Sequence, residues 1–433
     1  MLLRIILLSC FLYPAAFSSS AASFNPLEKN IDDIKIYYAY DDFLPIISMN
    51  IAIKNSGIAY VDEDLVGINA VVSYLANNFL FLQDQRERFS SELSARNIGV
   101  SFKSDKENFY ITLKFMSSDI AFITEFLQHF FYKFEVTKES VAKAKEYLSY
   151  NRDNSYLNSN FVSYQNFSQN FFDERFRRNG FMRDDNYDKI NIEAVNQFVE
   201  NLADKEQLKI AIAGDLKEGK LDGFIKGLFE EFEAKSGTDE YQAELIRSAN
   251  QEIQLEGYDQ VIFYSGIAGP SRTDKDFYAF YIFNHLFGGS PRNSLIGIRL
   301  REEAGLTYSG YSYVNYFRDL GYLTVYFACD KAKYQQASAV IADLLSDIKT
   351  HKFTEAELAV AKQYLMGKYD IAFSSNSRIS GFMLGLLVHD LPVSMLKDRN
   401  KFVEDVSLED IHRIRDKLFL ENDFMTVVTG DLD

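Results

Sequence analysis

The segment VTKESVAKAKEYL at residues 136–148 returns later in the chain as FTEAELAVAKQYL at residues 353–365. Thr354 follows Thr137 by 217 positions (354 − 137 = 217). The spacing then persists. IEAV at 192–195 is matched by LEDI at 408–411, and the Gly of IAGDL is matched by the Gly of VTGDL 216 positions later (430 − 214 = 216). Matches that keep their order at a nearly constant spacing indicate two homologous halves of roughly 200 residues each.

Each half is predicted to mix strands with helices. Apolar side chains occupy every second position from 109 to 115 and from 323 to 327, which is typical of strands with one buried face. Helical spacing of apolar residues occurs within residues 68–75, 120–131, 334–348 and 411–418. We therefore expect an α+β fold of two homologous domains, each a mainly antiparallel sheet that helices cover on one side.

The boundary between the two halves is predicted from composition. The stretch EAKSGTDE, which begins at residue 233, is polar and has no hydrophobic period. This composition favours a linker at residues 236–250, between a first domain at 23–235 and a second domain at 251–433.

The first 22 residues are predicted to be an export signal. Arg4 supplies the positive charge, residues 5–17 the short apolar core, and Ser20-Ala21-Ala22 a cleavage site of small residues. The apolar run is shorter than the roughly 20 residues that a membrane-spanning helix needs, and no later segment suggests a membrane anchor. We expect an exported protein, most simply in a bacterial periplasm. Lipidation at Cys10 is the alternative, with few apolar residues before that cysteine.

The charge of the chain excludes some classes of partner. Without Arg4, 45 basic side chains face 62 acidic ones, a net charge of −17 (45 − 62 = −17). Such an acidic chain is not expected to bind nucleic acid or anionic lipid. Beyond the signal, Cys329 is the only cysteine, so no intrachain disulfide can form, and we expect this thiol to be a small buried hydrophobe.

A helix that ends against a strand is predicted at residues 297–312, GIRLREEAGLTYSGYS. Leu295, Ile298 and Leu306 are expected to point inward. Gly305 is the residue type that ends a helix in the left-handed conformation. The sequence therefore predicts a sharp corner at this glycine.

Arg301 and Tyr308 stand on either side of the predicted corner, seven positions apart. A guanidinium and a phenol can there face one bound peptide, although an ordinary surface pair is the alternative. The Leu-Arg-Glu run, the Gly and the Tyr together resemble the C-terminal-half signature of the insulinase/pitrilysin family of zinc peptidases, which includes the mitochondrial processing peptidases. In that family this Arg and Tyr come from the half without zinc, clamp the substrate and support the oxyanion. The resemblance implies the same roles for Arg301 and Tyr308.

The resemblance also makes a demand on the first half of the chain. Active members carry His-x-x-Glu-His on the first long helix, where the two His hold zinc and the Glu activates water. The corresponding positions here are Ala70, Ser73 and Tyr74. Ala70 has no donor atom, Ser73 cannot act as a base near neutral pH, and a neutral Tyr74 is a poor zinc ligand. The family's third ligand, a Glu, falls at residues 149–151, where there is no carboxylate.

A displaced metal site is not predicted either. The histidines occur singly, and none lies three or four positions from another: His129, His285, His351, His389 and His412. We therefore expect this chain to bind no metal and no cofactor of its own.

Two hypotheses of function fit these observations. In the first, the chain is a catalytically incomplete subunit, inactive alone, that pairs as a heterodimer with a zinc-bearing paralogue and supplies Arg301 and Tyr308 to peptide hydrolysis. In the second, it is a non-enzymatic scaffold, like the core subunits of this fold in respiratory complexes. The retained Arg and Tyr and the export signal favour the first hypothesis.

Overall fold

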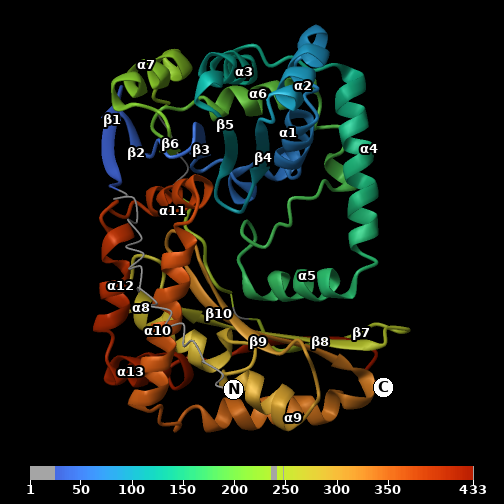
Figure 1. Ribbon diagram of the computed structural model, residues 1–433. Coiled ribbons are helices and arrows are strands. Elements are labelled where there is room, and N and C mark those ends of the chain that lie inside the picture. The colour runs from blue at the N-terminus through green and yellow to red at the C-terminus, as the bar shows by residue number, and fades with distance from the viewer. Residues whose placement is uncertain (1–24, 236–240, 247, 433) are drawn as a thin grey trace, which may run out of the picture.

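The computed structural model describes residues 25–235, 241–246 and 248–432, which form two halves stacked one above the other (Figure 1). The predicted signal at residues 1–22 lies outside the described residues. So do positions 236–240 and 247 of the predicted linker.

The first half is built on a mixed sheet with the strand order β1-β2-β6-β3-β5-β4. Strands β2 and β6 run parallel, and the other neighbouring pairs run antiparallel. The strands are β1 (Leu27–Ile31), β2 (Ile34–Tyr40), β3 (Ile46–Ile53), β4 (Gly99–Ser104), β5 (Phe109–Met116) and β6 (Leu208–Gly214). The helices are α1 (Ile68–Asn77), α2 (Arg86–Ala95), α3 (Ile120–Tyr132), α4 (Lys138–Ser155), α5 (Ser159–Phe171), α6 (Ile192–Leu202) and α7 (Glu218–Phe229).

The second half repeats this plan with a sheet of order β7-β11-β8-β10-β9. Strands β7 and β11 run parallel, and the other pairs run antiparallel. The strands are β7 (Gln251–Gln254), β8 (Gln260–Gly269), β9 (Tyr311–Tyr316), β10 (Gly321–Asp330) and β11 (Met425–Gly430). The helices are α8 (Phe277–Asn284), α9 (Tyr334–Asp347), α10 (Glu355–Ala372), α11 (Asn376–Val388), α12 (Met395–Asp405) and α13 (Leu408–Phe419).

The internal repeat is visible in the helices. Helices α4 and α10 each begin after a Thr whose hydroxyl accepts a backbone N–H one turn later, from Ser140 to Thr137 at 3.0 Å and from Glu357 to Thr354 at 3.2 Å. Such caps satisfy backbone donors that the first turn leaves free. The next helices, α5 and α11, start 217 positions apart (376 − 159 = 217). The predicted α+β fold of two homologous halves is confirmed.

The two halves exchange one helix each. Helix α5 of the first half packs on β8 and β11 of the second sheet, where Phe167 and Phe171 are fully buried among Tyr264 and Met425. Helix α11 of the second half packs on β2, β3 and β6 of the first sheet through residues such as Met383. Figure 1 shows α11 beneath the first sheet, and α5 held over the second sheet by the long α4.

This exchange overturns the expectation that each sheet is covered on one side. In the first sheet, one face of β3 packs against a core that includes α1, α3 and α6, and the other face contacts α11. Seven of the eight residues of β3, IISMNIAI, are accordingly buried. Alternation persists in β5, whose sequence gave the prediction. The two polar residues of β3 are buried as well, because Ser48 pairs with Ser377 of α11 at 2.9 Å and Asn50 donates to Ser380 at 2.7 Å.

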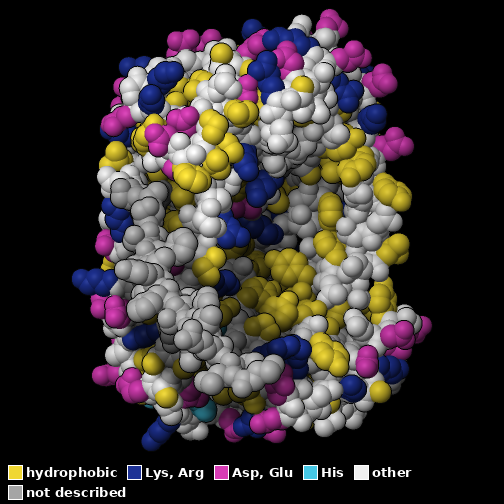
Figure 2. All heavy atoms as spheres, in the orientation of Figure 1, with side chains coloured by type: hydrophobic (Ala, Val, Ile, Leu, Met, Phe, Trp, Pro, Cys, Tyr) yellow, Lys and Arg dark blue, Asp and Glu magenta, His cyan; other side chains and the backbone are white. Residues whose placement is uncertain are grey.

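A hollow lies between the halves. In Figure 2, hydrophobic side chains gather on its lower wall, and Lys and Arg side chains lie on its upper wall.

Among the described residues, no single helix has both the length and the apolar composition to cross a membrane. Residues 355–371 and α11 reach that length and composition only when they are taken together, and the two helices are bent by 116° relative to each other. Cys329 is buried in β10, as expected, and burial raises the pKa of its thiol to about 11.

Candidate functional site

The predicted corner forms at Gly305, which has a φ of +60°. The Gly305 N–H donates to the carbonyl of Arg301 at 3.2 Å, and the Leu306 N–H donates to the carbonyl of Leu300 at 2.9 Å. This pair of bonds closes the end of a helix around a left-handed residue. The buried side chains of Leu300 and Leu306 pack into the core of the second half. The helix before the corner is a π-helix, Gly297–Glu303.

The π-helix explains one wrong prediction about the inward face. Ile298, expected to point inward, is 36% exposed, whereas Ile296 and Leu300 are fully buried. Because a π-helix has a wider turn than an α-helix, the positions that face the core shift along the sequence. Leu306 points inward as expected.

Arg301 and Tyr308 lie together at this corner. The guanidinium carbon of Arg301 is 5.6 Å from the centroid of the Tyr308 ring, a distance at which a cation is attracted to an aromatic face. The Arg301 Nε is also 3.7 Å from Glu302 Oε1. The residue Tyr308 is 88% exposed, whereas the Arg301 side chain is 27% exposed. The corner thus presents a phenol to solvent above a half-buried cation.

The chain on the far side of the corner is fixed to β10. The Thr307 hydroxyl donates to the carbonyl of Ala328 and accepts the N–H of Ser309 at 3.0 Å. Thr307 is buried, so these bonds are protected from water. Tyr308 therefore projects from a rigid base.

The corner is linked to the α4–α5 arm, residues 138–171, which joins the halves. The Tyr311 ring lies 5.0 Å from the Tyr326 ring, and the Tyr326 hydroxyl donates to Asn160 Oδ1 at 2.6 Å, at the start of α5. The exposed end of the α4–α5 arm is thus close to the same edge of the second sheet.

The three degenerate zinc positions lie on one face of α1. The Tyr74 ring packs at 4.8 Å against the ring of Tyr147 on α4. The hydroxyl of Ser73 is buried without a hydrogen-bond partner, and Ala70 offers no donor. Over the described residues, no three His, Cys, Asp or Glu side chains come together as metal ligands would. The side chains on this face do not fit a zinc ion.

The sequence reasoning missed two arginines, Arg272 and Arg399, which line one cavity of about 290 Å³ in the second half. Nothing in their sequence spacing connects them. One signal was available for Arg399, because it shares a helical face with the buried Leu396 and Val403 of α12. A charged side chain at such a position is seldom buried unless it is paired.

A comparison with protein families matches part of the chain. Residues 189–365 match the model described as Peptidase M16 inactive domain. The match runs from before α6, through the corner, to the repeated segment of α10.

Two curated relatives come from Bacillus subtilis (strain 168). The chain is 24% identical to the "Probable inactive metalloprotease YmfF" over 55% of this chain and 56% of that protein. It is 25% identical to the "Uncharacterized zinc protease YmxG" over 55% of this chain and 58% of that protein. The chain thus spans a little over half the length of these two relatives.

Solved structures share the fold over nearly the whole chain. A peptidase M16 inactive domain from Pseudomonas fluorescens superposes with a TM-score of 0.83 at 16% identity, covering 94% of this chain and 98% of that one. A protease from Helicobacter pylori superposes with a TM-score of 0.81 at 14% identity, covering 94% and 99%. The predicted family resemblance is confirmed: residues 189–365 match a peptidase M16 inactive domain, and the fold of nearly the whole chain is that of a solved M16 inactive-domain protein.

Proposed function

We propose that this chain is the exported, zinc-free subunit of a heterodimeric peptidase, and that it holds peptide substrates for a zinc-bearing paralogue. The observation that carries the proposal is the Arg301–Tyr308 pair, displayed on a rigid corner by a chain whose Ala70, Ser73 and Tyr74 cannot hold zinc. A scaffold alone needs no exposed phenol above a cation at that place.

The two side chains have different tasks in this proposal. The Tyr308 hydroxyl donates a hydrogen bond to the oxyanion that develops on the substrate carbonyl, and such a donor is most effective when it is fixed in advance. Arg301 orients the peptide through charge-assisted hydrogen bonds to its carbonyl groups. The partner's zinc supplies the activated water.

The surface of α4 supports a partner of this kind. Tyr150 is 67% exposed, and Leu157, just beyond the helix, is 74% exposed. Figure 2 shows hydrophobic side chains along this edge of the molecule. A docked paralogue would cover them, and a stable interface would bury more than about 1,200 Å² in total.

The predicted export signal and the acidic composition complete the proposal. An export signal places the pair outside the cytoplasm, and a bacterial periplasm is the simplest compartment. The net charge of −16 favours a peptide over nucleic acid as the bound substrate.

The test is a complex reconstituted with a family member that has an intact His-x-x-Glu-His motif. Loss of one oxyanion donor typically lowers turnover by about a hundred- to a thousandfold, so we expect this loss in kcat for Tyr308→Phe, with complex formation unchanged. Arg301→Ala is expected to act mainly on KM, because it removes substrate orientation. Steady-state peptide cleavage and size-exclusion chromatography measure both.

Tyr40→Phe is the matched control, since it changes another exposed tyrosine, at the end of β2, outside the corner and outside the surface of α4. It should leave turnover unchanged. Full peptidase activity from a complex that carries Tyr308→Phe and Arg301→Ala together would contradict the substrate-holding role and favour a scaffold.

A further inference from the structure

A second candidate site lies in the C-terminal half, among helices α8, α10, α11 and α12. It is the cavity of about 290 Å³ that Arg272 and Arg399 line. This volume is at the lower end of the range for sites that bind small molecules. The residues around it include none of those at the Gly305 corner or on α1.

Four of the residues that line this cavity carry polar atoms without partners. Arg272 Nη1, the hydroxyls of Tyr278 and Tyr316, and His389 Nδ1 are all buried and make no hydrogen bond within the described residues. Buried polar groups in folded proteins nearly always have a partner. Four such atoms around one cavity indicate a missing polar ligand or bound water.

The charge of the cavity selects an anion. Its lining contains the two guanidinium groups and, within the described residues, no carboxylate. Asp390, which follows His389, is paired with Lys54 at 2.7 Å, and Asp370 accepts a hydrogen bond from Asn400 at 2.8 Å. These two acids thus have partners elsewhere, and Asp398 of α12 is the acid whose charge acts on Tyr278.

Aromatic rings surround both guanidinium groups. Arg272 lies 3.9 Å from the centroid of Phe277, and Arg399 lies 4.6 Å from that of Tyr369. Arg399 Nη1 also donates to the Leu365 carbonyl at 3.0 Å, which fixes its position. Rings attract these cations but leave their positive charge uncompensated.

His389 adds a neutral polar group. Burial and the nearby Arg272 lower the pKa of its imidazole to about 4. A neutral imidazole offers one donor and one acceptor, so it can contribute a hydrogen bond without a third positive charge.

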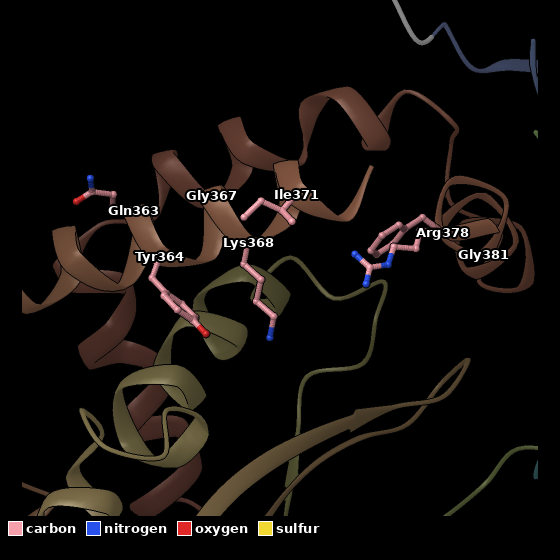
Figure 3. A pocket seen from close by; sticks show the side chains of 8 residues that line it. Gln363, Tyr364, Gly367, Lys368, Ile371, Arg378 and Gly381 are labelled. Carbon is pink, nitrogen blue, oxygen red and sulfur yellow. The ribbon is translucent and has the colours of Figure 1, made fainter. Parts of the chain in front are cut away.

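The cavity adjoins a larger groove of about 890 Å³ between α10 and α11, and Gly381 and Phe382 line both spaces. Figure 3 shows Lys368 of α10 and Arg378 of α11 directed into this groove. The groove also exposes Ile371, which is 70% accessible. It therefore joins an apolar surface to further positive charge.

Glycine residues keep this space open. A side chain added at Gly381 or Gly385 would meet no atom within 4 Å of its Cβ. Glycine within a helix is less stable than alanine, so these positions retain space at a cost in helix stability. A bulky residue at Gly385 is expected to take up space in the cavity.

We propose that the inner cavity binds the carboxylate of an organic acid or of a peptide C-terminus, with the attached apolar group in the groove between α10 and α11. A carboxylate accepts several hydrogen bonds at once, so it can satisfy Arg272, Tyr278 and Tyr316 together. The site needs no partner chain and does not depend on the function proposed for Arg301 and Tyr308.

The proposal is tested with the purified full chain by isothermal titration calorimetry. The probes are 3-phenylpropionate, its amide, and the acetylated tripeptide Ala-Ala-Phe with a free or an amidated C-terminus. We expect each acid to bind at least about ten times more tightly than its amide, because the amide lacks the charge. Binding of 3-phenylpropionate but not of the tripeptide acid identifies a small organic acid as the ligand. Tighter binding of the tripeptide acid than of 3-phenylpropionate identifies a peptide C-terminus.

Two variants connect the binding to the cavity. Arg272→Gln should weaken it by roughly ten- to a hundredfold, since a charge-assisted hydrogen bond is lost. Tyr316→Phe should weaken it severalfold and leave the heat stability of the free protein unchanged or higher, because the hydroxyl that it removes has no partner. A purely structural Tyr316 would show no change in binding.

Gly385→Leu, which fills the cavity, should abolish binding, and Arg299→Gln is the control. Arg299 is a partly exposed arginine that faces Asp347 at 3.2 Å, away from the site. Equal affinity for acid and amide, no binding of either acid, binding of inorganic phosphate in preference to them, or unchanged affinity in both Tyr316→Phe and Gly385→Leu would overturn the proposal.

Discussion

Gly305 determines where the Arg301–Tyr308 pair stands. Its φ of +60° strains a residue with a side chain, although an added Cβ would meet no atom within 4 Å. We expect Gly305→Ala to lower the free energy of unfolding by about 1 kcal/mol through backbone strain alone. Urea unfolding followed by circular dichroism measures it.

Gly227 in α7 provides the matched control, because its added Cβ also meets open space and its φ is not positive. Gly227→Ala should raise the free energy of unfolding by up to about 1 kcal/mol, since alanine favours a helix. A Gly305→Ala protein as stable as the parent would show that the left-handed conformation does not hold the corner.

The residue-level predictions from sequence differed in quality for a physical reason. Gly305 was found because the left-handed conformation has a strong residue preference. The prediction that Ile298 points inward is wrong, because the π-helix changes the spacing of the inward positions. No residue type indicates a π-helix in the sequence. The Arg272 cavity was missed since its parts meet only in the folded chain.

At the scale of elements, the exchanged helix α5 is central to stability. Phe167 is fully buried against the second sheet, where its ring packs on Tyr264 with centroids 5.5 Å apart. We expect Phe167→Ala to cost about 3 to 5 kcal/mol, because a large cavity opens between the halves. Denaturant unfolding at equilibrium measures this loss.

Leu157→Ala is the control for this prediction. Leu157 also lies on the α4–α5 arm, but it is 74% exposed. Its change should stay within about 0.5 kcal/mol, as is usual for surface positions. Similar losses in the two variants would mean that α5 is not a buried element of the second half.

The sequence could predict which segments form elements but not all of their partners. The periods at 120–131, 334–348 and 109–115 correspond to α3, α9 and β5. A hydrophobic period shows that one face of a helix or strand is buried, but it does not show which other element covers that face. Coverage of both sheets by α5 and α11 depends on contacts between residues more than 90 positions apart, such as Phe167 with Tyr264 and β2 with α11, and local pattern carries no record of these.

At the scale of the whole molecule, Glu107 lies where the halves meet. Its Oε1 accepts the backbone N–H of Arg318 from the second half at 3.2 Å, and Arg318 also donates to Asn55 at 2.7 Å. Burial raises the pKa of the Glu107 carboxyl to about 7. The folded protein therefore binds this proton more tightly than the unfolded chain, where the pKa is about 4.3.

The sign of the resulting pH dependence follows from linkage. Between about pH 4.5 and pH 7 the folded state holds the extra proton, so Glu107 lowers stability as pH rises through this window. We expect Glu107→Gln to gain stability over the parent by up to about 3 kcal/mol at pH 8, and by little at pH 5.

The comparison with the parent protein isolates this effect. The lowered pKa of His389 acts in the opposite direction below pH 6.5, but it is common to both proteins and cancels in the difference. Urea unfolding at a series of pH values gives the difference directly. A difference that is constant with pH would mean that Glu107 is already ionised in the folded protein at pH 5.

The reciprocal placement of α5 and α11 makes the covalent connection between the halves dispensable once the chain has folded. If a protease site is introduced at residues 236–240 and cut, we expect the two fragments to elute as one particle and to separate only in denaturant. Each fragment carries the helix that closes the other's sheet. Separation in native buffer would contradict this. Two copies of the repeat joined in this way are arranged as separate chains are in a domain-swapped dimer, here contained within one polypeptide.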